Sequence, residues 1–141
     1  MALRHASARI GGGNVSPPLA WEGVPAEAKR LLFVLEDTDA PVLRPILHTV
    51  ALFEVGQRGL VEGGLVVGAR GVAFFRASRG RLGYFGPGPV AGHGPHRYSF
   101  TLFALGAGFV APPPGSTIVE LAQAAKGQVL ARGRVTGTYE R

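Results

Sequence analysis

The stretch of residues 83–105, GYFGPGPVAGHGPHRYSFTLFAL, constrains the fold of this chain more than any other. Its first half is a loop dense in glycine and proline, and its second half is a strand-like run that follows without a break. Glycine lets the backbone approach a ligand or adopt positive φ, whereas proline fixes φ and removes a hydrogen-bond donor. The loop is therefore predicted to have a fixed shape, and its junction with a rigid strand is predicted to present a binding site.

Other strand-like segments lie on both sides of this stretch. Residues 30–36 form a continuous apolar run, which predicts a strand buried on both faces, and residues 46–54 form a second strand. From Arg97 to Leu105 the side chains alternate between two faces, neither of them very polar, which predicts a central strand. The remaining strand candidates are residues 65–67, 72–75 and 128–140.

One helix is predicted over residues 117–126, because apolar residues recur there at the i, i+3, i+4 and i+7 positions. Ser116 is the predicted N-cap of this helix, and Gly127 is the predicted stop signal. Many short strands, one short helix and irregular connections rich in glycine and proline predict an all-β, or mainly β, sandwich or barrel.

The length of 141 residues predicts a single domain over residues 1–141, which buries roughly two-thirds of the surface of the unfolded chain. Within it, residues 1–10 are interpreted as a lead-in that is truncated or flexible. No apolar run approaches the roughly 20 residues of a membrane-spanning helix, so no transmembrane segment is expected. The start lacks an apolar signal sequence and the chain lacks cysteine, so a cytoplasmic location is expected.

The protein is basic, with a formal net charge of +6 and 13 arginines against 2 lysines. A basic surface attracts anions in general, including phosphate ligands, anionic lipid and nucleic acid. The arginines are scattered rather than arranged in a run, so no specific nucleic-acid partner is expected. The densest group, which leads into the Gly/Pro loop, is Arg70, Arg76, Arg79, Arg81 and Arg97. This group is either a solvated basic face or an anion-attracting rim around the loop.

The polar residues that can carry chemistry are few, and most of them lie at predicted strand ends. They are Asp37, Asp39, His48, His93, His96 and Tyr98, and the two aspartates are the only ones in the chain. Strand ends can converge in a sandwich, and buried carboxylate and imidazole groups need partners. One interpretation is an anion pocket in which imidazole, phenol and loop N–H groups donate to phosphate oxygens. A second is a divalent metal site, since two imidazoles and a carboxylate can bind such an ion.

Two further interpretations use the same residues differently. In one, Ser16 or Ser78 joins a histidine and Asp37 in a hydrolase triad, although no G-x-S-x-G motif is present. In the other, the histidines are structural, and His5 and His93 take no part in a site. The spacing of the residues alone leaves these alternatives open.

Four motifs in order resemble those of the phosphatidylethanolamine-binding protein family, over about residues 10 to 139. They are NVSPPLAW at residues 14–21 followed by GVP at 23–25, DTDAP at 37–41, His48, and GYFGP at 83–87 leading to GPHRY at 94–98. The bacterial and archaeal branch, similar to the Raf kinase inhibitor protein, is the closer match. The resemblance implies a β-sandwich with one short helix near the C-terminus and a small pocket for phosphate or phosphorylated head groups.

The resemblance also implies which residues form the pocket and which support it. The ligand-binding residues carried over from the family motifs are Asp37, Ala40, Pro41, His48, Gly88, His96 and Tyr98. Arg97 and Asp39 are expected to be structural, with Asp39 fixing its loop. Three departures from the family pattern affect the pocket: Thr38 stands for the usual proline, Thr49 for a common aromatic, and Ser78-Arg79-Gly80 for a segment that often has an asparagine.

The expected function is binding of a small phosphate-type anion or a phospholipid head group, without catalysis, a cofactor or a metal. Members of the family include kinase and protease inhibitors, so a kinase or protease is the kind of protein partner that the resemblance implies, and a homodimer is left open. The alternative function is a small hydrolase or metal-dependent enzyme that uses Asp37, His48 and His96.

Overall fold

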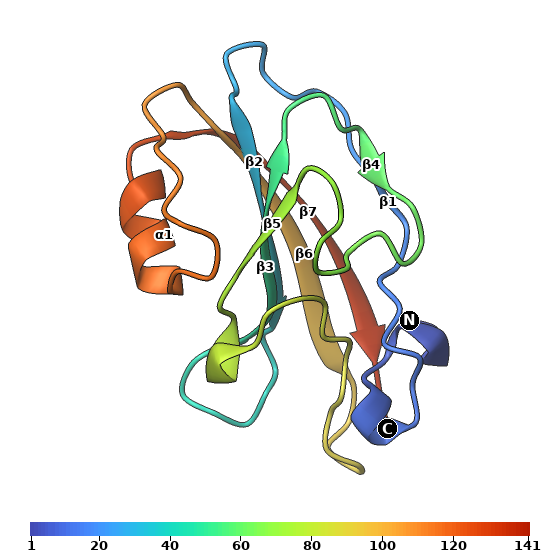
Figure 1. The fold of residues 1–141 in the computed structure, drawn as a ribbon. Coiled ribbons are helices and arrows are strands. Elements are labelled where there is room, and N and C mark those ends of the chain that lie inside the picture. Colours follow the sequence, from blue (N-terminus) through green and yellow to red (C-terminus); the bar gives the residue numbers. More distant parts are fainter.

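The computed structural model describes residues 1–141, and its centre is a five-stranded antiparallel sheet with the strand order β5-β3-β2-β6-β7 (Figure 1). The strands are β2 (Arg30–Asp37), β3 (Ile46–Glu54), β5 (Val72–Phe75), β6 (His96–Leu105) and β7 (Val129–Tyr139). A second antiparallel sheet pairs β1 (Leu19–Ala20) with β4 (Gly59–Leu60). The helical elements are α1 (Ile118–Ala125) and the 3-10 turns η1 (Leu3–His5), η2 (Ala8–Ile10) and η3 (Ser78–Gly80).

The three central strands, β2, β3 and β6, are buried on both faces, as their continuous apolar sequences predict. Side chains alternate between two cores: Phe33 and Phe53 lie in one, whereas Leu32 and Leu52 lie in the other. In β6 the face that carries Tyr98 belongs to the first core, as the alternation predicts. Each large apolar side chain buried in this way contributes about 1.5–3 kcal/mol to the free energy of unfolding.

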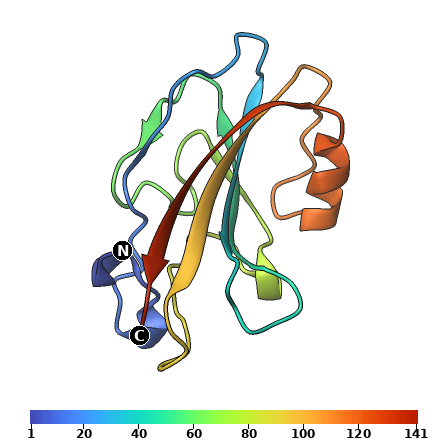
Figure 2. The same cartoon turned by 180° about the vertical axis from the view of Figure 1, so that it is seen from behind.

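The two faces of the sheet are covered by different layers (Figures 1 and 2). Helix α1 lies on one face, and its residues Leu121 and Ala125 pack into the second core. The small β1–β4 sheet and the extended segment before β2 cover the other face, where the only tryptophan, Trp21, stacks on Phe53. The prediction of a mainly β sandwich with one short helix near the C-terminus is confirmed.

Two local predictions are wrong. The helix is capped by Thr117 and not by Ser116: Glu120 N donates to Thr117 Oγ1, while Thr117 N donates back to Glu120 Oε2. This reciprocal capping box satisfies two backbone donors at once, which a serine one position earlier cannot do. Residues 65–67 are not a strand: Leu65 and Val66 lie in irregular chain, Val67 begins a turn, and only the side chain of Leu65 is buried.

The ends of the chain lie side by side at one end of the sheet (Figure 2). The Met1 ammonium donates to the carbonyl of Thr138 in β7 at 2.7 Å. A cavity of about 300 Å³ lies farther along the sheet, between the segment that includes Trp21 and the strands β2, β6 and β7. None of the helices has the length and apolarity that crossing a membrane requires.

Candidate functional site

The strand ends that carry the polar residues, the end of β2 and the start of β6, lie together at the lower end of the sheet in Figure 1. Antiparallel pairing places the end of β2 beside the start of β6, so that Asp37 is paired with Tyr98. His96 lies two residues before Tyr98 on the same face of β6, and the two rings stack with centroids 6.4 Å apart. The structure therefore brings Asp37, His96 and Tyr98 together, as predicted.

The side chains of Asp37 and His96 form a buried pair. His96 Nδ1 lies 2.8 Å from Asp37 Oδ2, and both side chains are at most 5% exposed. A carboxylate only accepts hydrogen bonds, so Nδ1 carries the proton and donates it. This tautomer directs His96 Nε2 away from the aspartate and into the site, where the nitrogen can meet a ligand.

His48 reaches the same site through an irregularity in strand pairing. Leu35 pairs with Thr49 and Glu36 pairs with Leu47, which leaves His48 without a partner in β2. Such a β-bulge redirects the side chain of the extra residue. The His48 ring consequently meets the ring of Tyr98 edge to face, with centroids 5.4 Å apart.

The hydrogen bond and burial of His48 define its protonation. His48 Nδ1 donates to the carbonyl oxygen of Phe85 at 3.1 Å, since a carbonyl can only accept. Burial lowers the pKa of His48, although the hydrogen bond to Phe85 and the charge of Asp37 partly oppose that effect. The neutral ring therefore offers Nε2 as an acceptor, for example to the hydroxyl of a protonated phosphate.

The Tyr98 hydroxyl is a buried polar group without a partner. The residue is fully buried, and no atom meets the distance and angle of a hydrogen bond to its hydroxyl. Burial raises the pKa of Tyr98, as do the negative charge of Asp37 and the closeness of that carboxylate to the phenol, while the nearby N–H of Gly88 acts in the opposite direction. A neutral phenol that donates to a ligand oxygen would satisfy this group.

The Gly/Pro loop is held in place by the N-terminal segment. Asn14 Nδ2 donates to the carbonyl of Tyr84, and Gly86 N donates back to Asn14 Oδ1, both at 2.9 Å. The Tyr84 hydroxyl donates to the carbonyl of His5, and Ser7 N donates to the carbonyl of Pro87. The fixed shape predicted for the loop is therefore supplied largely by residues 5–14, and not by glycine and proline alone.

Asp39 and Arg97 support the site from outside. Asp39 accepts from both the backbone N–H and the guanidinium of Arg97, with three contacts of 2.7–2.8 Å. These hydrogen bonds hold the pKa of Asp39 far below its ordinary value. The backbone N–H of Asp39 in turn donates to Asp37 Oδ1 at 2.9 Å. Asp39 therefore fixes its loop, as expected, and the loop orients the buried carboxylate of Asp37.

The remaining predicted residues contribute backbone or lie at the edge. Gly88 is half-buried beside Tyr98, with its N–H near the hydroxyl. Ala40 is half-buried and Pro41 is exposed in the loop after β2, and neither takes part in the hydrogen bonds that join the other residues. Thr49 Oγ1 accepts from the backbone N–H of Phe85 at 3.2 Å, so the small residue at this position anchors the loop.

One residue that the sequence analysis assigned to the structural alternative lies at the site. His93 Nδ1 is 3.3 Å from His96 Nε2, and the two rings meet edge to face. His93 thus contacts Nε2, the nitrogen of His96 that does not face Asp37. His93 lies three residues before His96, in a loop that turns back at Gly92 and Gly94, both of which have positive φ. This short spacing within a turning loop was the sequence signal that could have placed His93 at the site.

The serines of the proposed triad are used elsewhere. Ser16 Oγ accepts from Leu65 N, and Ser78 Oγ accepts from Leu47 N, whereas neither hydroxyl is hydrogen-bonded to a histidine. No group of three or more His, Asp or Glu side chains is arranged to hold a metal ion. The site as built consists of a phenol donor, two imidazoles and a neighbouring loop N–H, a set suited to the oxygens of a small anion.

Comparisons with known proteins agree with this geometry. The family model described as phosphatidylethanolamine-binding protein matches residues 1–140. A UPF0098 protein of Aquifex aeolicus is 35% identical over 132 residues, which cover 92% of this chain and 77% of the relative. The putative lipoprotein LppC of Mycobacterium tuberculosis is 39% identical over 129 residues, 92% of this chain but only 62% of the relative.

Two solved structures have the same fold. The crystal structure of Escherichia coli YbcL, described as a member of the mammalian PEBP family, superposes with a TM-score of 0.88 at 25% identity, covering 100% of this chain and 90% of the other. The putative homologue CT736 of Chlamydia trachomatis superposes with a TM-score of 0.84 at 28% identity, covering 99% and 88% of the two chains.

Proposed function

From the premise that this chain belongs to the phosphatidylethanolamine-binding protein family, we propose that it binds a small phosphate-type anion, free or as a phosphorylated head group, and does not catalyse a reaction. The anion sits among Asp37, His48, Gly88, His96 and Tyr98. Ala40 and Pro41 form the adjoining wall of the loop after β2.

The observation that carries the proposal is the Tyr98 hydroxyl. A buried hydroxyl without a hydrogen bond costs about 1–3 kcal/mol, and native proteins contain few such groups. Its neighbours are the two imidazoles of His48 and His96 and the N–H of Gly88. A phosphate oxygen placed there accepts from the phenol and from the loop N–H, and so satisfies the orphaned group.

The charges around the site favour the same ligand. Both oxygens of Asp37 already accept hydrogen bonds, one from His96 and one from the backbone N–H of Asp39. With its proton on Nδ1, His96 offers Nε2 as an acceptor to the hydroxyl of a protonated phosphate once His93 moves away from that nitrogen. The net charge of +6 raises the local concentration of anions around the whole molecule.

For the wider biological role, the proposal follows the expectations drawn from the sequence. We propose a regulatory protein of the Raf-kinase-inhibitor-like branch, with a kinase or protease as its partner. A homodimer is left open here as well. Cytoplasmic location stays a prediction, and one relative is named a putative lipoprotein.

The test is the thermal stability of the protein against inorganic phosphate and phosphoethanolamine. At about 100 times its dissociation constant, a ligand of the folded state adds roughly 2.7 kcal/mol to the free energy of unfolding. We expect this stabilisation for wild type and its loss in His96→Ala. The matched control is Ser99→Ala, because Ser99 lies on the same strand but bonds Thr136 on the opposite face. Absence of stabilisation by either ligand in wild type would refute the proposal.

Metal analysis of the purified protein separates the proposal from the enzyme alternative. One tightly bound metal equivalent that a chelator removes, together with no effect of phosphate, would favour a metal-dependent enzyme that uses Asp37, His48 and His96. A phosphate effect that persists after chelation would favour the binding protein. If stabilisation by phosphoethanolamine exceeds that by phosphate, the ligand is a head group rather than the free anion.

A further inference from the structure

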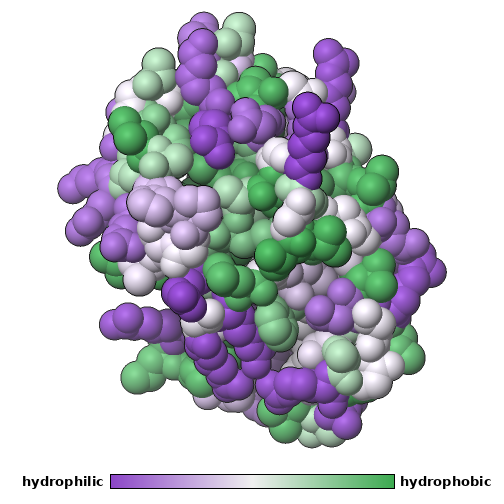
Figure 3. Space-filling view, in the orientation of Figure 1, coloured by the Kyte–Doolittle hydropathy of each residue, from purple (hydrophilic) through white to green (hydrophobic).

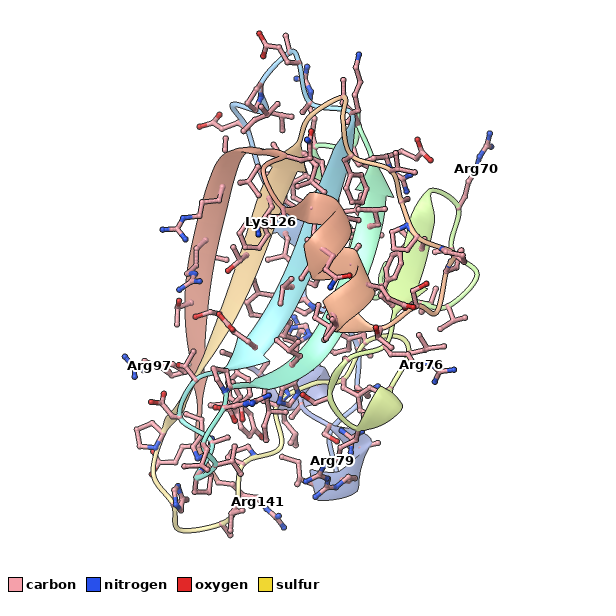
Figure 4. The ribbon with its side chains drawn as sticks, turned by 90° about the vertical axis from the view of Figure 1, so that its left-hand side faces the viewer. Arg70, Arg76, Arg79, Arg97, Lys126 and Arg141 are labelled. Atoms are coloured by element: carbon pink, nitrogen blue, oxygen red, sulfur yellow. The ribbon has the colours of Figure 1, made fainter.

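Three arginines gather beside the site without acidic partners. Arg79 and Arg81 lie in and directly after η3, and Arg9 lies in η2. Figure 4 shows Arg79 at the same end of the molecule as η2, and Figure 3 shows strongly hydrophilic side chains gathered around η3. None of the five ion pairs of the protein includes Arg9, Arg79 or Arg81. Partial burial and the charges of the other two arginines lower the pKa of Arg81.

Arg81 contacts the candidate site through one residue, Phe85. Its guanidinium carbon lies 4.3 Å from the centroid of the Phe85 ring. The carbonyl of the same phenylalanine accepts the hydrogen bond from His48 Nδ1. The side chain of Phe85 thus contacts the Arg81 guanidinium, while its backbone carbonyl accepts the hydrogen bond that orients the His48 imidazole. The positive charge of Arg81 acts on His48, where it contributes to the lowered pKa.

The segment that carries Arg79 and Arg81 has a fixed and strained conformation. Arg79 has a φ of 63°, one of only two non-glycine residues in the chain with positive φ. The turn is anchored by the hydrogen bond from Arg76 Nη1 to the carbonyl of Gly80 and by that from Leu47 N to Ser78 Oγ. Left-handed backbone is costly for a residue with a Cβ, and such strain concentrates at binding sites.

We propose that Arg79 and Arg81 form a second anion subsite next to the phosphate pocket, so that the ligand is a phosphate ester whose substituent carries another negative charge. This inference rests on the proposed function, because the phosphate group of the ester occupies the pocket described above. The substituent leaves the pocket past Phe85 and meets the two guanidinium groups. An ester with an ammonium group, such as phosphoethanolamine, meets repulsion at the same place.

Three carboxylates at the end of β2, those of Glu36, Asp37 and Asp39, support this selectivity, since each already has cationic or N–H partners. Asp37 accepts hydrogen bonds from His96 and from the backbone N–H of Asp39. Asp39 forms an ion pair with Arg97, and Glu36 forms one with Arg134 at 3.4 Å. An ammonium group on the ligand therefore finds none of these three carboxylates free, whereas an anionic group finds unpaired arginines.

The experiment compares two phosphate esters of similar size by isothermal titration: phosphoglycolate, which carries a carboxylate, and phosphoethanolamine, which carries an ammonium group. For wild type we expect about tenfold tighter binding of phosphoglycolate, as a charge-assisted contact provides. The preference should shrink as salt is added, because the arginines are partly exposed to solvent. In Arg79→Gln/Arg81→Gln the two esters should bind with similar affinity.

Two controls separate the failure of this inference from the failure of the proposed function. Inorganic phosphate has no substituent, so it should still bind the double variant, and its failure to bind wild type would refute the pocket itself. Arg70→Gln removes one positive charge at a site that Figure 4 shows at the opposite end of the molecule, and it should keep the preference. Binding of phosphate with equal affinities for the two esters in wild type would overturn the second subsite alone.

Discussion

His96 Nδ1 lies 2.8 Å from Asp37 Oδ2, although 59 positions separate the two residues in the chain. The contact exists because β2 and β6 are antiparallel neighbours, so that the last residue of one strand faces the first residues of the other. Both side chains are nearly inaccessible to solvent. The pair therefore contributes to the stability of the fold and also sets which nitrogen of His96 faces a ligand.

Replacing Asp37 by alanine should destabilise the protein even without ligand. The variant leaves the buried Nδ1–H of His96 without an acceptor, which costs about 1–3 kcal/mol of the free energy of unfolding. Urea denaturation measures the change. Asp39→Ala is the matched control, because the pair of Asp39 with Arg97 is exposed and should contribute much less. Equal losses in the two variants would show that the buried pair has no special weight.

Replacing Tyr98 by phenylalanine should separate stability from binding. The hydroxyl has no partner in the ligand-free protein, so its removal should leave the free energy of unfolding unchanged or raise it. The stabilisation by phosphate should nevertheless decrease, because the phenol no longer donates to the anion. Denaturation with and without phosphate gives both quantities. A less stable variant with full phosphate binding would contradict the assigned role.

The lowered pKa of His48 predicts a loss of stability in acid. Between that lowered value and the ordinary value of 6.5, the unfolded chain binds a proton that the folded protein does not. The free energy of unfolding therefore falls as the pH drops below about 6.5. In His48→Asn this part of the pH dependence should disappear, because asparagine does not titrate but keeps a donor for the carbonyl of Phe85. Identical slopes for the two proteins between pH 7.5 and 5 would contradict the prediction.

Replacing Gly86 by alanine should be far more harmful than replacing Gly88. A Cβ at Gly86 would overlap the backbone carbonyl of His5, and backbone cannot move aside as a flexible side chain does. Overpacking of this kind costs about 1–3 kcal/mol. A Cβ at Gly88 would lie 3.3 Å from the Cβ of Ser7, a contact that a small shift relieves. Urea midpoints of the two variants test whether the N-terminal segment packs on the loop as described.

The corrected helix cap gives a further prediction. Thr117→Ala should lower the free energy of unfolding by about 1 kcal/mol, since it removes the acceptor for the N–H of Glu120. Ser116→Ala should have little effect, because Ser116 donates to the exposed carbonyl of Pro113 and caps nothing. Denaturation of the two variants decides between the positions, and a larger effect at Ser116 would restore the cap predicted from the sequence.

Much of the central sheet could be predicted because local patterns determine it. Apolar runs of strand length predicted β2 and β3, and alternation predicted which face of β6 carries Tyr98. The residues 65–67 show the limit of this approach. Three consecutive apolar residues fit a strand or a turn equally well, and only the surrounding structure decided that Leu65 alone is buried.

Local patterns also predicted some of the residues of the candidate site. Motifs at the strand ends identified Asp37, His48, His96 and Tyr98, but the sequence contains no local signal for a bulge at His48 or for the positive φ of Arg79. His93 and Asn14 were assigned no role at the site. Both act through partners, His96 and the loop at Gly86, whose positions depend on long-range folding.

The sequence by itself therefore determined the five strands of the central sheet, their buried faces and the residue types available at their ends, because these follow from the local order of apolar, polar, glycine and proline residues. The Gly/Pro stretch before His96 marked where a site would lie. Only the tertiary structure decided which atoms meet there: antiparallel pairing joined Asp37 to His96, a bulge turned His48 toward Tyr98, and residues 5–14 fixed the loop. Such contacts join residues distant in sequence, so no local pattern encodes their geometry.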